Sequence, residues 1–455
     1  MRVKQESMPE FSEGSPRRHS LSRISVFSVV SLLLVVALAL LAGCGSDRLV
    51  ASLFIPDANN NRVLIYSAPF TNGMNAATVL GQTDFVSSNA GLSQTAMNYP
   101  YATAVDGEGN LYVSDLSNCR VLQFRPPFTN GKSATLAFGE PDLATANCYT
   151  GLSANASSLG SANGVAVDSH GNLWVADSAN SRILEYTPPF VTGQAAVVAI
   201  GQPTTNGVSD TDSCNQGNSS GGGAAVNFLC YPTHLAFDAA GNLWVADTGN
   251  NRILQFQPPF TTDMDASLEL GQPAGATQFT SNTPNNPVLQ ASSVYLPTGV
   301  AFDGAGNLLV ADTGNSRVLQ FKPPFSNGGN ASFVLGQSDF SGGSVNQGLS
   351  APTAATLYYP AGVTLDYAGR IVVGDTGNNR TLIFTAPAAN GTNAMAVLGQ
   401  PDFVSNADNQ GLGAPTAATQ SAPFGLPSWV TLLVFAGLVA VWVVRRRNRL
   451  ATARQ

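Results

Sequence analysis

Charged residues are scarce in this sequence of 455 residues, where Asp, Glu, Lys and Arg together make up only 11%. Long solvated helices are therefore not expected to dominate the fold. Glycine (45 residues) and proline (27 residues) are plentiful instead. This composition suits many short strands joined by turns, and the length allows either several average domains or one large repeat domain.

Basic residues are especially few away from the two ends of the chain. Of the 21 Lys and Arg residues, five lie in residues 1–43 and five in 445–455, which leaves 11 against 25 acidic residues in 44–444. A surface that acidic repels phosphate backbones. We therefore expect no nucleic-acid partner.

Long apolar runs occur only near the two ends. Basic residues precede an apolar run from Ile24 to Ala42, which leads to Leu41-Ala42-Gly43-Cys44. Residues 1–43 are predicted to be a signal peptide. Small residues before the cysteine resemble the lipobox of bacterial lipoproteins, and that resemblance implies lipidation of Cys44. An ordinary signal peptide or an uncleaved anchor is the alternative.

The second apolar run, Leu426 to Val444, precedes an Arg-rich tail, residues 445–455. At about 1.5 Å per residue the run spans roughly 28 Å, close to a hydrocarbon core. It is predicted to be a transmembrane helix with the basic tail in the cytoplasm; a buried core helix or a sorting signal is the alternative. Both ends then place residues 44–425 in the cell envelope, outside the cytoplasm.

A repeat fills the region between the two runs. The stretch Asp238 to Phe256 recurs from Asp106, Asp168, Asp303 and Asp366, and a shorter first copy runs from Leu53 to Tyr66. In the fourth copy, four segments have the pattern of strands, and we call them a, b, c and d. They are Leu235–Asp238, Leu243–Asp247, Arg252–Phe256 and Ser267–Leu270.

The turns between these segments carry their own signals. Gly-Asn before strand b is expected to supply the positive φ angles of a tight hairpin, and Pro-Pro-Phe after strand c stops that strand. The first copy lacks a clear strand a, for which residues 48–52 are a weak candidate. A truncated seventh copy places residues 421–425 where another strand a would begin, so the chain ends are candidates for closing a ring.

Four antiparallel strands repeated around an axis predict an all-β, six-bladed β-propeller over residues 44–425. The pattern Gly-Val-Ala-Val-Asp, Gly-Asn-Leu-Trp-Val-Ala-Asp and Asn-Arg-Ile resembles the NHL-repeat family. The resemblance covers about residues 50–402 in six in-phase copies.

Strand alternation sorts the loops onto two faces. The b–c turns and the long d–a inserts are expected on one face, and the a–b turns and Pro-Pro-Phe loops on the other. Because long loops on a rigid scaffold often carry function, the insert face is the candidate binding surface. The alternative is that the inserts are tolerated surface additions without a function. Five insert aromatics are expected to contribute stacking: Phe85, Tyr149, Phe228, Phe279 and Phe340.

Each copy has one Asp at the end of strand b and one Arg at the start of strand c. We interpret these as structural pairs across one hairpin, with a ligand-binding ring of Arg as the alternative. The pairs are Asp57 and Arg62, Asp115 and Arg120, Asp177 and Arg182, Asp247 and Arg252, Asp312 and Arg317, and Asp375 and Arg380.

Four cysteines follow Cys44, an even number that suggests disulfides in an exported domain. Local pairing predicts Cys119 with Cys148 and Cys214 with Cys230, one of three connectivities. A zinc site is not expected, because no Cys-x-x-Cys or nearby His occurs.

Two functions compete. The first is a non-enzymatic module that binds or scaffolds a protein, peptide or glycan. The second follows from the resemblance, since some related propellers are metal-dependent lyases or lactone hydrolases. Residues 44–425 hold only His170 and His234, too few for a zinc lyase. A calcium site needs no His, and Asp210 and Asp212 are its candidate ligands, so a calcium-dependent hydrolase or lyase is the alternative. Otherwise no cofactor is expected.

Overall fold

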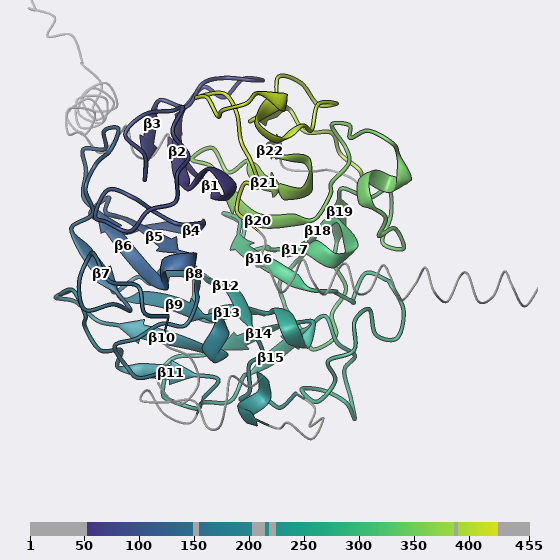
Figure 1. Ribbon diagram of the computed structural model, residues 1–455. Coiled ribbons are helices and arrows are strands. Elements are labelled where there is room, and N and C mark those ends of the chain that lie inside the picture. The colour runs from purple at the N-terminus through teal and green to yellow at the C-terminus, as the bar shows by residue number, and fades with distance from the viewer. Residues whose placement is uncertain (1–51, 149–153, 203–213, 218–223, 386–389, 426–455) are drawn as a thin grey trace, which may run out of the picture. The chain divides into compact units, whose positions relative to one another are not determined.

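Six β-sheets are arranged around one axis in the computed structural model (Figure 1), which describes residues 52–148, 154–202, 214–217, 224–385 and 390–425. Five sheets have four antiparallel strands and the first has three. Each sheet is one blade, and in blades 2 to 6 strand a lies nearest the axis (Figure 1). The all-β, six-bladed propeller predicted from the sequence is confirmed. The predicted signal peptide, the lipidated Cys44, the transmembrane helix and the basic tail lie outside the described residues.

The strands, blade by blade, are β1 (Ser52–Asp57), β2 (Arg62–Ser67) and β3 (Thr78–Leu80); β4 (Pro100–Val105), β5 (Leu111–Asp115), β6 (Arg120–Phe124) and β7 (Leu136–Phe138); β8 (Ala162–Val167), β9 (Leu173–Asp177), β10 (Arg182–Tyr186) and β11 (Val198–Ile200); β12 (Pro232–Phe237), β13 (Leu243–Asp247), β14 (Arg252–Phe256) and β15 (Leu268–Leu270); β16 (Pro297–Phe302), β17 (Leu308–Asp312), β18 (Arg317–Phe321) and β19 (Phe333–Leu335); β20 (Pro360–Leu365), β21 (Ile371–Asp375), β22 (Arg380–Phe384) and β23 (Ala396–Leu398).

Short 3₁₀ turns make up the only helices of the described residues. Six of them connect strand b to strand c: η1 (Ala58–Asn60), η2 (Leu116–Asn118), η4 (Ser178–Asn180), η6 (Thr248–Asn250), η7 (Thr313–Asn315) and η9 (Thr376–Asn378). Three others lie between blades: η5 (Cys214–Gly217), η8 (Val345–Gly348) and η10 (Asp408–Gly411).

The a–b hairpins depend on one Asp and one Gly. In blade 4, Gly241 has a φ of 82°, a conformation that glycine adopts without steric cost. The Oδ1 atom of Asp238 accepts hydrogen bonds from the backbone of Ala240 and Asn242, each at 2.9 Å. The expectation that both Gly and Asn take a positive φ is therefore half right, because Gly241 has a positive φ and Asn242 does not. The side chain of Asn242 instead donates a hydrogen bond to Asp238.

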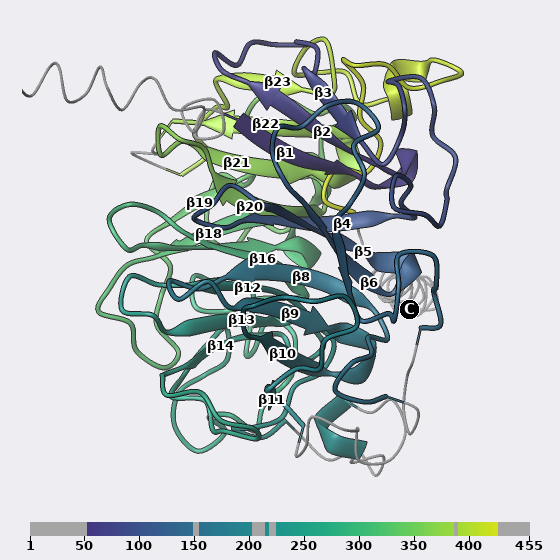
Figure 2. The same cartoon turned by 90° about the vertical axis from the view of Figure 1, so that its left-hand side faces the viewer.

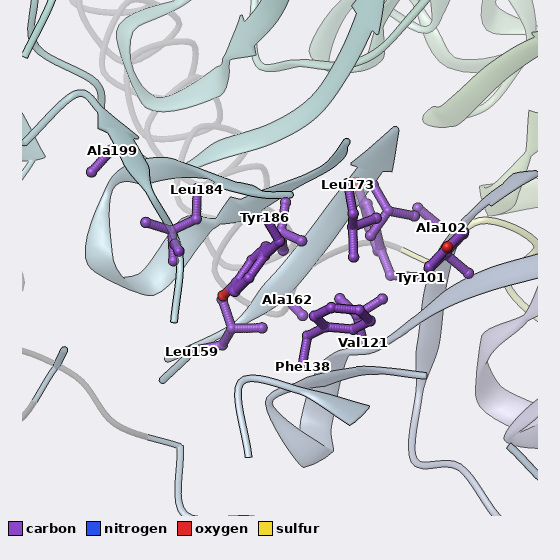
Figure 3. Packing of buried hydrophobic residues seen from close by; sticks show 14 residues of the cluster. Tyr101, Ala102, Val121, Phe138, Leu159, Ala162, Leu173, Leu184, Tyr186 and Ala199 are labelled. Carbon is purple, nitrogen blue, oxygen red and sulfur yellow. The ribbon is translucent and has the colours of Figure 1, made fainter. Parts of the chain in front are cut away.

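The hydrophobic core is divided among the six spaces between blades. Each buried cluster combines residues of two neighbouring blades. Between blades 2 and 3, for example, Tyr101 and Phe138 of blade 2 pack with Ala162 and Tyr186 of blade 3 (Figure 3). Burying one large apolar side chain contributes about 1.5–3 kcal/mol, so a blade gains most of its stability from its neighbours.

The C-terminal end of the described chain closes the ring against blade 1. Pro423 forms a β-bridge with Asp57, the last residue of β1, and the Phe424 amide donates to the Pro56 carbonyl at 3.0 Å. This segment therefore takes the place of strand a in blade 1. Of the candidate segment 48–52, the structure describes only Ser52, which begins β1 and so belongs to strand b, because β1 pairs with β2.

Phe424 also fastens this segment to blade 6. It is only 8% exposed, and its ring covers Gly362 and Gly374, where an added Cβ would come within 2.4 and 2.2 Å of ring atoms. Glycine at both positions makes the room that the ring occupies.

Replacing Phe424 with Ala should lower the free energy of unfolding by about 3–5 kcal/mol, because it empties this site and weakens ring closure. Denaturant titration followed by tryptophan fluorescence would measure the change. The control Val404→Ala, at a residue that is 58% exposed, should change stability by less than about 0.5 kcal/mol. Equal effects would contradict the role given to Phe424.

Candidate functional site

The six long connections between blades lie on the same face as the b–c turns. Seen from the side, the 3₁₀ turns lie toward one edge of the propeller (right in Figure 2). We call these connections inserts and this side the insert face. The inserts run from the end of each strand d to the next strand a: 81–99, 139–161, 201–231, 271–296, 336–359 and 399–422.

Each blade holds one buried Asp and one buried Arg at its b–c turn. In all six pairs the Arg Nε lies 2.7–2.8 Å from the Asp Oδ2, and both side chains are fully inaccessible to solvent. The structure thus brings together every pair that the repeat singled out.

The Asp of each pair also binds the preceding insert. In blade 5, Oδ1 of Asp312 accepts the backbone N–H of Tyr295 at 2.7 Å, and Oδ2 accepts the side chain of Asn315 at 2.8 Å. The other five Asp residues make equivalent bonds. The end of each insert is therefore held where strand a begins.

The Arg of five pairs reaches two different inserts, one before and one after its blade. Nη2 of Arg317 donates to the carbonyls of Gln290 and Ser293, in the insert before its blade, at 3.0 and 2.9 Å. Its Nη1 donates to the Phe340 carbonyl, in the insert after its blade, at 2.5 Å. The Nη2 atoms of the other five Arg make the same double contact. We call this unit the Asp–Arg clamp.

The clamps leave no guanidinium free to bind a ligand at the surface. Each Arg is enclosed by its Asp and by insert carbonyls, which does not fit the alternative of a ligand-binding Arg ring. Burial raises the pKa of Asp312, while the charge of Arg317 acts in the opposite sense. A charge-assisted hydrogen bond stabilises by about 1.5–3 kcal/mol, so the clamps order the inserts strongly.

Side-chain amides provide a second anchor that the repeat pattern did not reveal. Asn346 in η8 and Asn378 in the next b–c turn each donate to the other's oxygen, at 3.1 and 2.9 Å. Asn409 pairs with Asn60 and Asn215 with Asn250 in the same way. The triplet Asn-Gln-Gly, which recurs at 215–217, 346–348 and 409–411, was the available signal.

Both predicted disulfides are confirmed. Cys119 of a b–c turn bonds to Cys148 of the following insert, and Cys214 bonds to Cys230 within one insert. Both bonds lie on the insert face, so they tie down the two inserts next to blade 3.

The insert aromatics are less available than expected. Phe85, Phe279 and Phe340 are half-buried and pack against the interblade clusters, and their carbonyls accept from clamp arginines. Phe228 is half-buried too, and its carbonyl accepts from Arg252. Tyr149 lies outside the described residues. These rings are thus anchors rather than exposed stacking surfaces.

The opposite face carries a shallow cleft of about 770 Å³ between blades 2 and 3, lined by Asp106, Glu108, Asp168 and His170 among others. Asp106 and Asp168 are engaged in their own a–b turns. Among the described residues, no group of three or more His, Cys, Asp or Glu side chains could hold a metal ion. The candidate calcium ligands Asp210 and Asp212 lie outside those residues.

His234 occupies an unusual position on the inner strand β12. The corresponding residues of four other inner strands are Ala102, Gly164, Gly299 and Gly362, so His234 alone brings a large side chain there. Its Nδ1 atom is inaccessible to solvent and has no hydrogen-bond partner. Burial lowers the pKa of His234 to about 4.

The repeat unit also matches a family model. The NHL repeat model matches residues 159–186, 229–256 and 295–321, and each match spans the end of an insert, strands a to c and one Asp–Arg clamp. The protein is an NHL-repeat β-propeller. No curated protein sequence matches it significantly.

Solved structures resemble this NHL-repeat propeller at low sequence identity. A protein of unknown function from Bacteroides caccae is 10% identical, with a TM-score of 0.44, over 82% of this chain and 98% of that chain. A virginiamycin B lyase from Staphylococcus aureus is 12% identical, with a TM-score of 0.37, over 74% of this chain and 82% of that chain. A gluconolactonase from Xanthomonas campestris is 15% identical, with a TM-score of 0.34, over 80% of this chain and 84% of that chain. These TM-scores are too low to carry an argument about function.

Replacing Arg317 with Met should lower the free energy of unfolding by about 3–5 kcal/mol, because Asp312 and three carbonyls lose a buried partner. Lys322→Met is the matched control, because Lys322 follows β18 on the opposite face of the same blade and is exposed. This substitution should change stability by about 0.5 kcal/mol or less. Urea titrations of both variants would measure the two changes. Similar losses of unfolding free energy would contradict the role given to the clamp.

Acid should destabilise the fold through His234. Its pKa is lower in the folded than in the unfolded state, so stability is complete above about pH 6.5 and falls as the pH drops toward 4. The slope contributed by this one group is about 1.4 kcal/mol per pH unit. Unfolding titrations across this range should show that His234→Gln removes this slope and that His170→Gln, at an exposed residue, keeps it. A wild-type slope in His234→Gln would contradict this assignment.

Proposed function

We propose that this NHL-repeat propeller is a non-enzymatic binding or scaffolding module that recognises a protein, peptide or glycan through its insert face. The observation that carries the proposal is the set of Asp–Arg clamps, which hold six inserts on one face of a stiff ring. Ordering loops in advance lowers the entropic cost of binding.

We further propose that the propeller is tethered to a membrane of the cell envelope, outside the cytoplasm. The support is the signal-like start with Cys44 and the apolar segment 426–444 before the Arg-rich tail. The two disulfides add to it, because such bonds persist in oxidising compartments. In the stretches that the structure describes, no helix is long and apolar enough to cross a membrane, and both proposed anchors lie outside them.

The proposed partner is not a nucleic acid. The region between the ends is acidic, and none of the six inserts contains a Lys or Arg, so a phosphate backbone would meet repulsion on the insert face. The enzymatic alternative, a calcium-dependent hydrolase or lyase, has no observation among the described residues that favours it.

Exchanging insert tips for Gly-Ser segments of equal length should abolish retention of partners from an envelope extract. Suitable exchanges are 86–92, 341–352 and 404–415, because they keep the carbonyls of residues 85, 93, 340, 353, 403 and 416 that accept from clamp arginines. The clamp contacts stay, but the exchanges 341–352 and 404–415 remove Asn346 and Asn409 with their amide pairs. These two exchanges should therefore lower stability to a limited extent, which urea titration of each variant would measure. Quantitative mass spectrometry of co-purified proteins and glycans would measure retention.

The matched control carries Val105→Ser, Val191→Ser and Tyr367→Ser, three exposed residues of the opposite face, and should retain partners normally. Unchanged retention after all three exchanges would refute binding through the insert face. A hydrolytic activity that a calcium chelator abolishes would favour the enzymatic alternative instead.

A further inference from the structure

The exposed charges of the insert face have one sign. Five exposed carboxylates lie on the described inserts: Asp84, Asp142, Asp339, Asp402 and Asp408. The inserts contain no Lys, Arg or His, and the clamp arginines are buried. The other described basic residues all lie on the opposite face, in or beside the a–b turns and Pro-Pro-Phe loops: Arg125, Lys132, Lys322 and Arg370. Among the described residues, the clamps therefore bury all the cations that lie near the insert face.

Aliphatic side chains stand exposed among these carboxylates. Twelve large apolar residues are notably exposed in the described chain, and seven of them lie on inserts: Val86, Leu92, Val288, Val345, Leu349, Val404 and Leu412. Several occupy equivalent positions. Val86 and Val404 follow Asp84-Phe85 and Asp402-Phe403, and Leu92, Leu349 and Leu412 each follow a glycine. Single exposed apolar residues scattered over a surface need no explanation. These valines and leucines recur at equivalent positions of different inserts, which indicates a shared role.

The backbone holds two of these leucines at a sterically unfavourable turn. Gln347 and Gln410 have φ angles of 56° and 58°, in the left-handed region that non-glycine residues rarely adopt. The neighbouring Asn346 and Asn409 also have positive φ and are anchored by the amide pairs. Such strain persists only where the surroundings enforce it, so Leu349 and Leu412 are presented in a set position.

The carboxylates are similarly preorganised. Oδ1 of Asp402 accepts the backbone N–H groups of Ser405 and Val404 at 2.8 and 3.0 Å, and hydrogen bonds led by that from the Ser405 side chain lower its pKa. Asp84 makes the equivalent bonds to Val86 and Ser87. Each of these two inserts therefore presents a fixed negative charge two residues from an exposed valine.

From this juxtaposition we infer that the partner of the insert face is a basic protein surface or peptide that carries aliphatic side chains among its Lys and Arg residues. The inference rests on the proposed function and narrows its partner class. A one-signed surface attracts and orients a partner of the opposite sign, while the exposed Leu and Val residues bury apolar area against it.

Other occupants fit this chemistry less well. Glycan binding would use exposed aromatic faces, and the insert aromatics Phe85, Phe279 and Phe340 are half-buried and packed on the core. An anionic lipid surface would be repelled by carboxylates and finds no basic residue in the inserts. A basic protein surface uses both the charges and the aliphatic side chains.

The test measures binding of a short fluorescein-labelled peptide of alternating Leu and Lys to the full chain by fluorescence anisotropy. Its affinity should exceed that of matched Leu-Glu and Ser-Lys peptides by about tenfold or more, because binding requires both charge and apolar contact. Raising the salt concentration should weaken binding of the Leu-Lys peptide.

Two triple variants and one control assign that binding to the insert face. Leu92→Ser with Leu349→Ser and Leu412→Ser should weaken it about tenfold or more, and so should Asp84→Asn with Asp339→Asn and Asp402→Asn. The asparagines keep the turn-capping oxygens, so a loss reports on charge. The control, Glu108→Gln with Asp265→Asn, removes two exposed carboxylates of the opposite face and should bind as the wild type does.

Equal binding of the Leu-Lys and Leu-Glu peptides, or unchanged binding by both triple variants, would overturn the inference. Loss of peptide binding in the control variant, without loss in the two triple variants, would also overturn it. Retention of acidic or glycan partners that depends on the insert tips would also overturn it while leaving the proposed function intact. Retention that ignores the insert tips would remove the proposed function itself.

Discussion

The buried Asp–Arg clamp is the contact on which the rest of this propeller depends. It closes the b–c hairpin, fixes the start of strand a through the Asp, and holds two successive inserts through the Arg. A buried ion pair alone contributes little net stability, because desolvation opposes the Coulomb attraction. Here the guanidinium satisfies carbonyls of irregular backbone that would otherwise be buried without partners. The clamp therefore makes long inserts compatible with a compact ring.

The same contact decides how charge is distributed over the surface. Six of the 11 basic residues between positions 44 and 444 are buried in clamps. The remaining described ones lie on the opposite face, so every exposed charge on the described inserts is a carboxylate. Disulfides and reciprocal Asn pairs hold further parts of the inserts. A structural requirement of the fold thus shapes the surface that we propose as the binding face.

Much of this architecture could be predicted from the sequence because it repeats. Strand b of blade 4 was expected at Leu243–Asp247 and strand c at Arg252–Phe256, and both were found with those bounds; the disulfides followed from local cysteine spacing. Features that depend on long-range contacts were harder. The sequence offers residues 48–52 as a weak candidate for the first inner strand, whereas Pro423 and Phe424 fill that place through contacts with distant residues. The burial of the insert aromatics could not be predicted, because composition does not show which ring packs under its own loop.

Amide hydrogen exchange of the native protein tests the central claim most directly. If the clamps order the inserts, the backbone amides of Tyr295 and Tyr358, which donate to Asp312 and Asp375 at 2.7 Å, should open only with energies near that of global unfolding. Amides at exposed insert positions such as Ala90 and Ser350 should exchange much faster. If the amides of Tyr295 and Tyr358 exchanged as fast as those exposed positions, the inserts would not be clamped, and the account would be contradicted.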